Sequence, residues 1–193
     1  MNDNRRTALV KMLETCLCDR SFMIDGRRIG FRLLRREDMD LWIDFVNGCS
    51  QESLWQRFMV PFSATPERAR RLCDIEPEKE PAVTAEMKEG VRSRVIGIAR
   101  LIKLSFDDKA EFAVIVSDPW QKKTLGRILL EMCIGLVKFW GVGSVFSETI
   151  MENRAAIKIL KRCNFKVEER HGNVFAMSLR LRAPQDLDLD DRC

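Results

Sequence analysis

Apolar residues in the first third of the chain recur mostly at helical spacing, interrupted by one pair of strand-like runs. Residues 1–20 carry such an apolar face and are predicted to form a helix. Three further helices are predicted to start near Arg36, Ser50 and Thr65, where polar residues typical of helix starts precede amphipathic segments. Strands are predicted at residues 22–24 and 29–34.

From residue 82 onward the pattern changes to short β-branched or alternating runs separated by turn residues, with two amphipathic helices among them. The helices are predicted at residues 125–140 and 153–163. The strands are predicted at residues 82–88, 95–104, 110–117, 145–150, 166–169 and 174–181. Strands and helices mixed in this way predict a single α/β domain.

The composition fits one globular domain and argues against two classes of partner. The chain has 193 residues, of which 46% are hydrophobic, and this is enough to bury a core. No apolar run reaches the roughly 20 residues that a membrane-spanning helix needs, and the N-terminus lacks the pattern of a signal peptide. The net charge of +4 is too small to indicate nucleic-acid binding. We therefore expect neither a membrane nor a nucleic acid as a partner, and either a monomer or a homodimer.

Cysteine usage indicates a reducing compartment and predicts no metal site. The seven cysteines are odd in number and form no CxxC pair, and His171 is the only histidine in the sequence. Zinc sites usually need such ligands at short paired spacing. We interpret the cysteines as buried free thiols in a cytoplasmic protein and predict no bound metal.

One stretch carries most of the chemical information, because a strand that contains Glu111 leads through a short turn into a helix. The turn and the helix start consist of Gln121, Lys122, Lys123, Thr124, Leu125, Gly126 and Arg127. A turn before a helix directs free backbone N–H groups at one point, where they attract phosphate. Two lysines and an arginine add positive charge. The pattern predicts a site for a phosphorylated cofactor, with a carboxylate on the strand beside it.

These segments resemble the GNAT superfamily of acetyltransferases. Its acetyl-CoA loop has Gln or Arg, two variable residues, Gly, one variable residue and then Gly or Ala, to which residues 121–126 are similar. A second signature, Asn-x-x-Ala at a helix start, is matched at residues 153–156, and residues 160–165 are similar to the segment that follows it. The resemblance covers residues 30–181. It implies a central, mixed, mostly antiparallel and splayed sheet of about seven strands flanked by helices, with acetyl-CoA as cosubstrate.

Within the superfamily, the chain is similar to the bacterial protein lysine acetyltransferase Pat and its relatives. The likeness rests on residues 31–38, 50–58 and 110–114. Larger Pat proteins carry a further domain, for which the remaining residues leave no room, so we expect a stand-alone catalytic domain. The expected division is an N-terminal extension at 1–28, an acetyltransferase domain at 29–182 and an acidic tail at 183–193.

The resemblance implies roles for individual residues. Glu111 would be the general base that takes a proton from the acceptor amine. The Val114 N–H would hold the thioester oxygen, and Val116 would pair with the pantetheine arm. The loop residues would bind the cofactor's phosphates, and Asn153 would contact the cofactor or cap its own helix. Residue types alone also allow a plainer interpretation: an ordinary exposed glutamate, core valines and a solvated basic face.

Thr124 departs from the family pattern, because it stands where the loop has its first glycine. Glycine allows a positive φ or a close approach of backbone to pyrophosphate. Either φ of Thr124 is negative and the cofactor still fits, or affinity falls. We expect retained binding, with the Thr124 hydroxyl as a candidate phosphate ligand. The chain also has no tyrosine, the residue that often protonates the leaving thiolate in this superfamily, so water or the unassisted thiolate has to serve.

Together these observations predict an acetyl-CoA-dependent N-acetyltransferase that transfers acetyl directly to an amine. The Pat likeness implies a protein lysine as acceptor, for example in acetyl-CoA synthetase. One alternative is a small amine, such as an amino acid, a polyamine or an aminoglycoside. The other is a non-catalytic CoA-binding module, to which Thr124 and the missing tyrosine point. An enclosed acidic pocket would favour a small amine, and an open groove would favour a protein.

Overall fold

The computed structural model describes residues 10–15, 17, 20–77, 79–90, 92–104, 108–137 and 141–181. Within them, eight strands form one sheet in the order β1-β2-β3-β4-β5-β6-β8-β7. All neighbouring pairs are antiparallel except β5 and β6. The strands are β1 (Ser21–Ile24), β2 (Arg27–Leu33), β3 (Ala82–Glu89), β4 (Arg92–Lys103), β5 (Lys109–Val116), β6 (Ser144–Ile150), β7 (Lys166–His171) and β8 (Val174–Arg180). The mixed, mostly antiparallel sheet is confirmed, with one strand more than expected, because β1 pairs with β2 at the sheet edge.

The helices lie close to their predicted positions, and residues 10–15 are helical as well. They are α2 (Met39–Asn47), α3 (Gln51–Phe58), α4 (Pro66–Cys73), α5 (Leu125–Val137) and α6 (Arg154–Arg162), with 3-10 turns η1 (Arg36–Asp38) and η2 (Asp118–Trp120). Ser50 and Thr65 cap α3 and α4, because their hydroxyls accept hydrogen bonds at 3.2 Å from the N–H groups of Ser53 and Arg68. The first part of the predicted N-terminal helix, residues 1–9, and residues 138–140 lie outside the described ranges.

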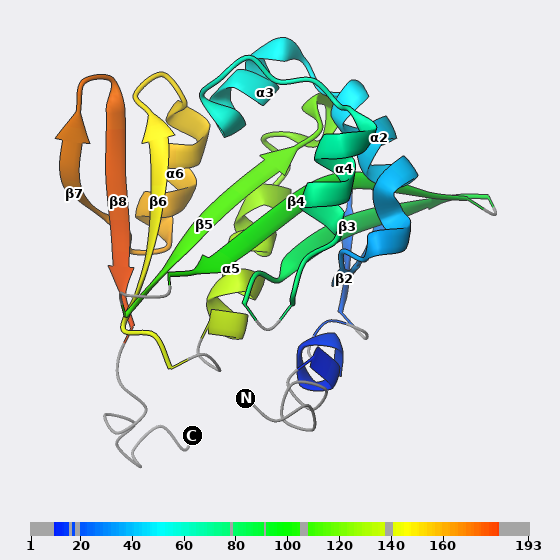
Figure 1. Ribbon diagram of the computed structural model, residues 1–193, viewed down its shortest axis with the longest axis horizontal. Coiled ribbons are helices and arrows are strands. Elements are labelled where there is room, and N and C mark those ends of the chain that lie inside the picture. Colours follow the sequence, from blue (N-terminus) through cyan, green and yellow to red (C-terminus); the bar gives the residue numbers. More distant parts are fainter. Residues whose placement is uncertain are drawn as a thin grey trace.

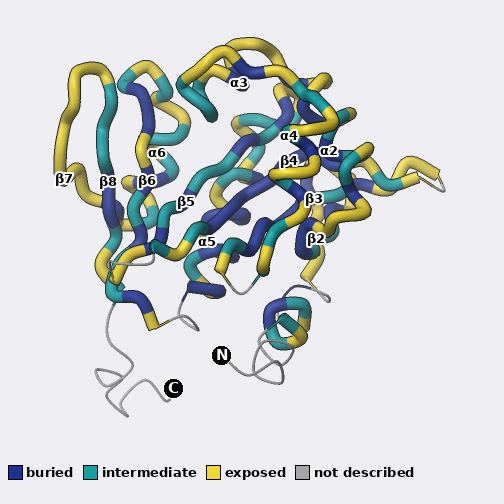
Figure 2. The backbone as a smooth tube through the Cα atoms, in the orientation of Figure 1, coloured by how far each residue is buried: buried dark blue, intermediate teal, exposed yellow. Residues whose placement is uncertain are grey.

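The sheet separates two layers of helices, each with its own apolar core (Figure 1). Helices α2 to α4 cover one face, and α5 and α6 cover the other. A Cβ on Gly97 of β4 would lie 3.1 Å from Leu129 Cδ1, so glycine allows α5 to approach the sheet closely. Figure 2 shows that β4 is buried over most of its length, whereas the edge strand β7 is exposed.

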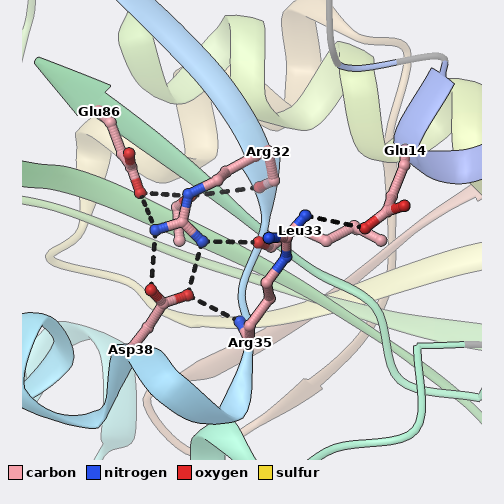
Figure 3. A network of polar contacts seen from close by, with 7 residues as sticks. Glu14, Arg32, Leu33, Arg35, Asp38 and Glu86 are labelled. Atoms are coloured by element: carbon pink, nitrogen blue, oxygen red, sulfur yellow. Dashed lines mark hydrogen bonds and ion pairs between the residues drawn. The ribbon is translucent and has the colours of Figure 1, made fainter. Parts of the chain in front are cut away.

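Arg32 on β2 joins the sheet to the helices of one layer (Figure 3). Its guanidinium lies 2.6 and 2.8 Å from the two carboxylate oxygens of Asp38 and 2.5 Å from Glu86 on β3. Burial alone would raise the pKa of Asp38, but the hydrogen bonds from Arg32 and the Arg35 N–H outweigh it and hold that pKa below its usual range. Arg35 in turn contacts Glu14 at 3.1 Å. The network fixes the chain where it passes from β2 into the helices.

The described cysteines agree with the prediction of buried free thiols. They are Cys49, Cys73 and Cys133, which are buried, and Cys163, which is half-buried. Burial is the main reason that the pKa of Cys49 rises to about 12. Cys16, Cys18 and Cys193 lie outside the described residues. None of the described helices combines the length and apolar character that crossing a membrane requires.

Candidate functional site

The candidate site lies where β5 and β6 separate. The two strands pair only from Lys109 and Ser144 to Glu111 and Phe146, although both continue for several residues. Beyond Glu111 they diverge and leave one edge of β5 unpaired, as Figure 1 shows. Helix α3 contacts both strands and therefore lies across the gap. The splay expected from the resemblance is present.

The backbone of β5 directs hydrogen-bond donors into this gap. The Ser117 N–H donates to the Ile96 carbonyl on β4 at 3.0 Å. Because N–H groups alternate in direction along a strand, those of Val114 and Val116 point away from β4 and toward the gap. The Val116 carbonyl accepts a hydrogen bond from Gln121 Nε2 at 3.0 Å. Both valine side chains pack against the core beneath α5, so the amide and the side chain serve different purposes.

A cleft opens between α3, the unpaired edge of β5, the loop before α5 and the start of α6. Its lining combines the residues predicted from the loop and strand with several from α3. The lining residues are Ser53, Gln56, Arg57, Val114, Ile115, Val116, Gln121, Lys122, Gly126, Asn153, Ala155, Ala156 and Ile159. The fold thus brings together in one cleft elements that are far apart in the sequence.

The loop before α5 has the free backbone donors that an anion requires. Within the described part of the chain, none of the consecutive N–H groups of residues 122–126 donates a hydrogen bond. Helix α5 starts here, because the Thr124 carbonyl accepts from the N–H groups of Arg127 and Ile128 at 3.0 and 3.1 Å. Unpaired donors at a helix N-terminus favour phosphate. The loop therefore fits the pyrophosphate of a nucleotide cofactor.

Thr124 holds the conformation that a glycine would adopt. Its φ is 73°, and φ of Lys122 is 58°. The alternative in which φ of Thr124 is negative is therefore wrong. A β-branched residue is rare in the left-handed region because its side chain crowds the backbone. The exposed Thr124 side chain forms no hydrogen bond within the described residues, and its contact with phosphate stays a prediction.

Two of the three predicted basic residues, and Leu125, do not line the cleft. Of the three basic residues, only Lys122 lines the cleft. The Lys123 ammonium lies 2.6 Å from Asp25, and Arg127 lies 3.7 Å from Glu131, the next carboxylate along its own helix. The Leu125 side chain is fully buried in the core, so only its backbone N–H is available to a ligand.

Gly126 and Asn153 connect the cleft to α6. A Cβ on Gly126 would lie 3.2 Å from Ile159 Cδ1, so glycine allows the start of α5 to pack against α6. The Asn153 side chain accepts a hydrogen bond from the Ala156 N–H at 3.0 Å, which confirms its capping role. Both residues line the cleft, and their contact with a cofactor stays a prediction.

Glu111 is half-buried on the face of the sheet that α3 covers. Ile115 packs into the core of that layer, and residues at alternate positions of a strand share a face. Burial is the main reason that the pKa of Glu111 is raised above its ordinary value. The Arg57 cation lowers this pKa, whereas the nearby charges of Glu148 and Glu80 raise it. A carboxyl with a raised pKa is a stronger base once ionised.

Arg57 on α3 is a residue to which sequence analysis assigned no role. It lines the cleft, and burial lowers its pKa to about 10, with a smaller contribution from the like charge of Arg100. Its guanidinium lies over the Phe58 ring at 4.8 Å. The only signal in the sequence was its position in the segment 50–58, which supported the family likeness.

Asp118 is a second residue that sequence analysis missed. Its carboxylate accepts hydrogen bonds from the Ser50 N–H at 2.9 Å, the Ser50 hydroxyl at 2.6 Å and the Ser53 hydroxyl at 2.9 Å. The Ser53 hydroxyl also accepts from Gln121 Nε2 at 2.8 Å. The start of α3 is therefore tied to the loop that precedes α5, although the two are far apart in the sequence.

Comparison with known proteins agrees with this geometry. Residues 28–166 match the family model described as the acetyltransferase (GNAT) domain. Over 132 residues the chain is 29% identical to the acetyltransferase PA5475 of Pseudomonas aeruginosa, an alignment that covers 68% of this chain and 71% of that protein.

Several solved structures share the fold at low sequence identity. The GNAT domain of PAT from S. lividans superimposes with a TM-score of 0.75 at 18% identity, over 84% of this chain and 96% of that one. Spermidine N-acetyltransferase from Vibrio cholerae, in complex with CoA and spermine, gives 0.64 at 18% identity, over 79% and 95%. Ribosomal-protein-S5-alanine acetyltransferase from Vibrio fischeri gives 0.66 at 15% identity, over 84% and 97%. At these identities the likeness concerns the fold.

Proposed function

This chain belongs to the GNAT family of acetyl-CoA-dependent N-acetyltransferases, and we propose that it acetylates a lysine side chain of a protein, with Glu111 as the general base. The cofactor class follows from the family. The acceptor and the residue roles are the proposal, and they are supported by the shape and charge of the cleft.

The cleft suits acetyl-CoA in two respects. The free N–H groups of residues 122–126 would hold the pyrophosphate, assisted by Lys122. The unpaired edge of β5 would pair with the amides of the pantetheine arm, chiefly through Val116. The Val114 N–H, directed into the same gap, would stabilise the oxygen of the thioester carbonyl as negative charge develops on it.

The chemistry requires a neutral amine next to the thioester. A lysine of pKa about 10.4 is neutral at pH 7 in roughly one molecule in a few thousand. Glu111 takes the proton, directly or through water, as the amine nitrogen bonds to the carbonyl carbon. The carbon–sulfur bond then breaks, and water protonates the leaving thiolate, since the chain has no tyrosine. A thiol of pKa about 8.5 leaves without further assistance.

The observation that favours a protein acceptor is the exposed indole of Trp55. Its side chain is 47% exposed although Gln56 and Arg57, the next two residues, line the cleft. Val60, just beyond the end of α3, is 53% exposed. The cleft-lining residues of α3 are Ser53, Gln56 and Arg57, so at helical spacing Trp55 lies on the outer side of the same helix. Large apolar groups exposed close to a cleft occur on surfaces that bind another protein. A small amine held inside the cleft would not need an apolar surface outside it.

The proposal is tested by the rate of CoA release with candidate acceptors. Lysine-containing proteins come first, among them acetyl-CoA synthetase, which the Pat likeness implies, and mass spectrometry locates the acetylated residue. Glu111→Gln should lower kcat/KM by about 10² to 10⁴, the usual value of a general base. The matched control is Glu169→Gln, an exposed carboxylate on the edge strand β7 that does not line the cleft, which should cost less than about tenfold.

Three outcomes would contradict parts of the proposal. A Glu111→Gln rate close to that of the unsubstituted protein would exclude Glu111 as the base. Turnover of polyamines or amino acids without turnover of any protein would move the acceptor to a small amine. Calorimetric binding of acetyl-CoA without turnover of any acceptor would indicate a non-catalytic module.

A further inference from the structure

Arg57 lines the cleft as a cation without an ion-pair partner among the described residues. Within the described ranges, no carboxylate oxygen lies within 4.0 Å of its guanidinium, and the guanidinium donates no hydrogen bond. Its contact is the Phe58 ring, with 4.8 Å between the guanidinium carbon and the ring centroid. Arginine in a desolvated site normally pairs with a planar anion through its fork of N–H groups. Arg57 therefore has donors available to a ligand.

The neighbouring Arg100, in contrast, has hydrogen-bond partners for its guanidinium. Arg100 on β4 is buried, donates to the Glu80 carboxylate and also donates to the Leu72 carbonyl. Arg100 is near enough to contribute to the lowered pKa of Arg57. Repulsion from this second cation raises the energy of the unpaired Arg57 guanidinium and strengthens the attraction of the site for an incoming anion.

Glu111 lies near Arg57 at the point where the strands diverge, and Glu148 lies near Glu111. Glu111 on β5 pairs in register with Phe146 on β6, and Glu148 lies two residues beyond Phe146. Residues at alternate positions share a face, so both carboxylates lie on the side of the sheet that α3 covers. Two anions and one unpaired cation thus lie close together beside the Val114 donor. This set complements an ammonium and a carboxylate held side by side.

We infer that Arg57 binds a carboxylate that the acceptor carries next to its reactive amine. This inference rests on the proposed function and deepens it: in a protein, the acceptor would be a lysine with an aspartate or glutamate beside it in the sequence. Glu111 and Glu148 attract the ammonium, and Arg57 orients the neighbouring carboxylate. Arg57 is then a specificity-determining residue that sets which lysines are acetylated.

The cofactor is a weaker explanation for the free guanidinium. The phosphates are served by the N–H groups of residues 122–126 and by Lys122. Arg57 instead influences the pKa of Glu111 on β5, and Arg100 on β4 lies beside it. Arg57 therefore lies near Glu111, the proposed base, which has to be close to the acceptor amine.

The test compares pairs of acceptors that differ by one carboxylate. Two lysine peptides carry glutamate or glutamine next to the lysine, and a second pair consists of free lysine and cadaverine, which lacks the carboxylate. The unsubstituted protein should show a kcat/KM about tenfold or more higher for the carboxylate-bearing member, the value of one charge-assisted hydrogen bond. Arg57→Gln should reduce this ratio toward one, and Arg57→Lys should give an intermediate ratio because a lysine cannot bind a carboxylate in two places.

The matched control is Arg68→Gln. The Arg68 guanidinium lies 4.7 Å from the Phe62 ring centroid, in the same kind of contact, but the residue does not line the cleft. This variant should leave the ratio unchanged. Urea unfolding of all variants checks that each is folded before rates are compared.

Each result decides the inference. Peptide turnover without preference for the glutamate peptide, or a preference that Arg57→Gln leaves intact, would overturn it while the proposed function stands. A preference for free lysine over cadaverine that depends on Arg57, without peptide turnover, would support the inference and reject the protein acceptor. Turnover of no acceptor would overturn both.

Discussion

Replacing Thr124 with glycine should stabilise this protein, although glycine at a helix start usually weakens a fold. The residue has φ of 73° and begins α5 through its carbonyl. Its side chain is exposed and forms no hydrogen bond within the described residues, so the substitution removes no contact there. The effect therefore isolates the conformational cost of a β-branched residue in the left-handed region.

The magnitude follows from two opposing contributions. A residue with a Cβ in the left-handed region costs about 1 to 2 kcal/mol, and β-branching places threonine at the upper end. Glycine returns about 0.4 to 1 kcal/mol of this through the greater freedom of the unfolded chain. The net expectation for Thr124→Gly is about 1 kcal/mol, which corresponds to a rise of roughly 2 to 4 °C in the melting temperature for a chain of this size.

The assay is urea and thermal unfolding of the ligand-free protein, with two controls. Thr124→Ala keeps a Cβ in the left-handed region and should recover only part of the gain. Lys122→Gly removes the other left-handed side chain of this loop, at φ of 58°, and should gain less because lysine is not β-branched. Calorimetry with acetyl-CoA adds a second readout, because a loss of affinity in Thr124→Gly that Thr124→Ser avoids would support the predicted contact between the hydroxyl and phosphate.

One result would refute this reasoning. If Thr124→Gly is no more stable than the unsubstituted protein while Thr124→Ala is equal to it, then the loop does not hold the left-handed conformation in solution. The loop would then have to rearrange when acetyl-CoA binds.

Three further perturbations test other parts of the structure. Asp38→Asn removes one of the two carboxylates that pair with the partly buried Arg32, while Glu86 remains, and should lower the free energy of unfolding in urea by about 2 kcal/mol. Glu14→Gln breaks an exposed pair and should cost less than about 1 kcal/mol. The folded-state pKa of Asp38 is depressed, so its contribution to stability is present above the unfolded pKa and is lost as the pH falls through the folded pKa. The free energies of unfolding of Asp38→Asn and of the unsubstituted protein should therefore converge in acid. A difference that stays constant with pH would contradict the assigned pairing. Asp118→Asn should raise the calorimetric Kd for acetyl-CoA several-fold with only a small change in melting temperature, and an unchanged Kd would show that α3 does not position the loop. Burial raises the pKa of Glu111, so the acid limb of the plot of kcat/KM against pH should lie above about 4.3. Arg57→Gln should move this limb to higher pH by removing the cation that lowers the pKa. A shift to lower pH would exclude Glu111 as the group that titrates there.

Local features of the chain were predictable because they depend on neighbouring residues. Ser50 and Thr65 were identified as helix starts, and each caps its helix with a side-chain hydrogen bond. The strands and helices from residue 82 onward lie within a few residues of their predicted limits. The loop at 121–126 was found because its residue types match a family pattern, and it does present free N–H groups.

Features that join distant segments were not predictable from the pattern. Nothing in the sequence around Asp118 indicates that its carboxylate binds the start of α3, since its partner Ser50 has a local role of its own as a helix cap. Arg57 was one polar residue on an amphipathic helix until α3 was placed over the gap between β5 and β6. A negative φ for Thr124 was one of two alternatives that the sequence left open, and the folded loop instead has a φ of 73°.

By itself, the sequence determined the elements, the family and the chemistry of the loop, because helix caps, alternation of apolar residues and short motifs act over a few residues. Tertiary structure alone decided which charges meet in the cleft. It buried Glu111 enough to raise its pKa, paired Lys123 with Asp25, and left Arg57 without a carboxylate partner among the described residues. The physical reason is that pKa values and ion pairs depend on desolvation and on distances between atoms, which only the packed sheet and its helices set.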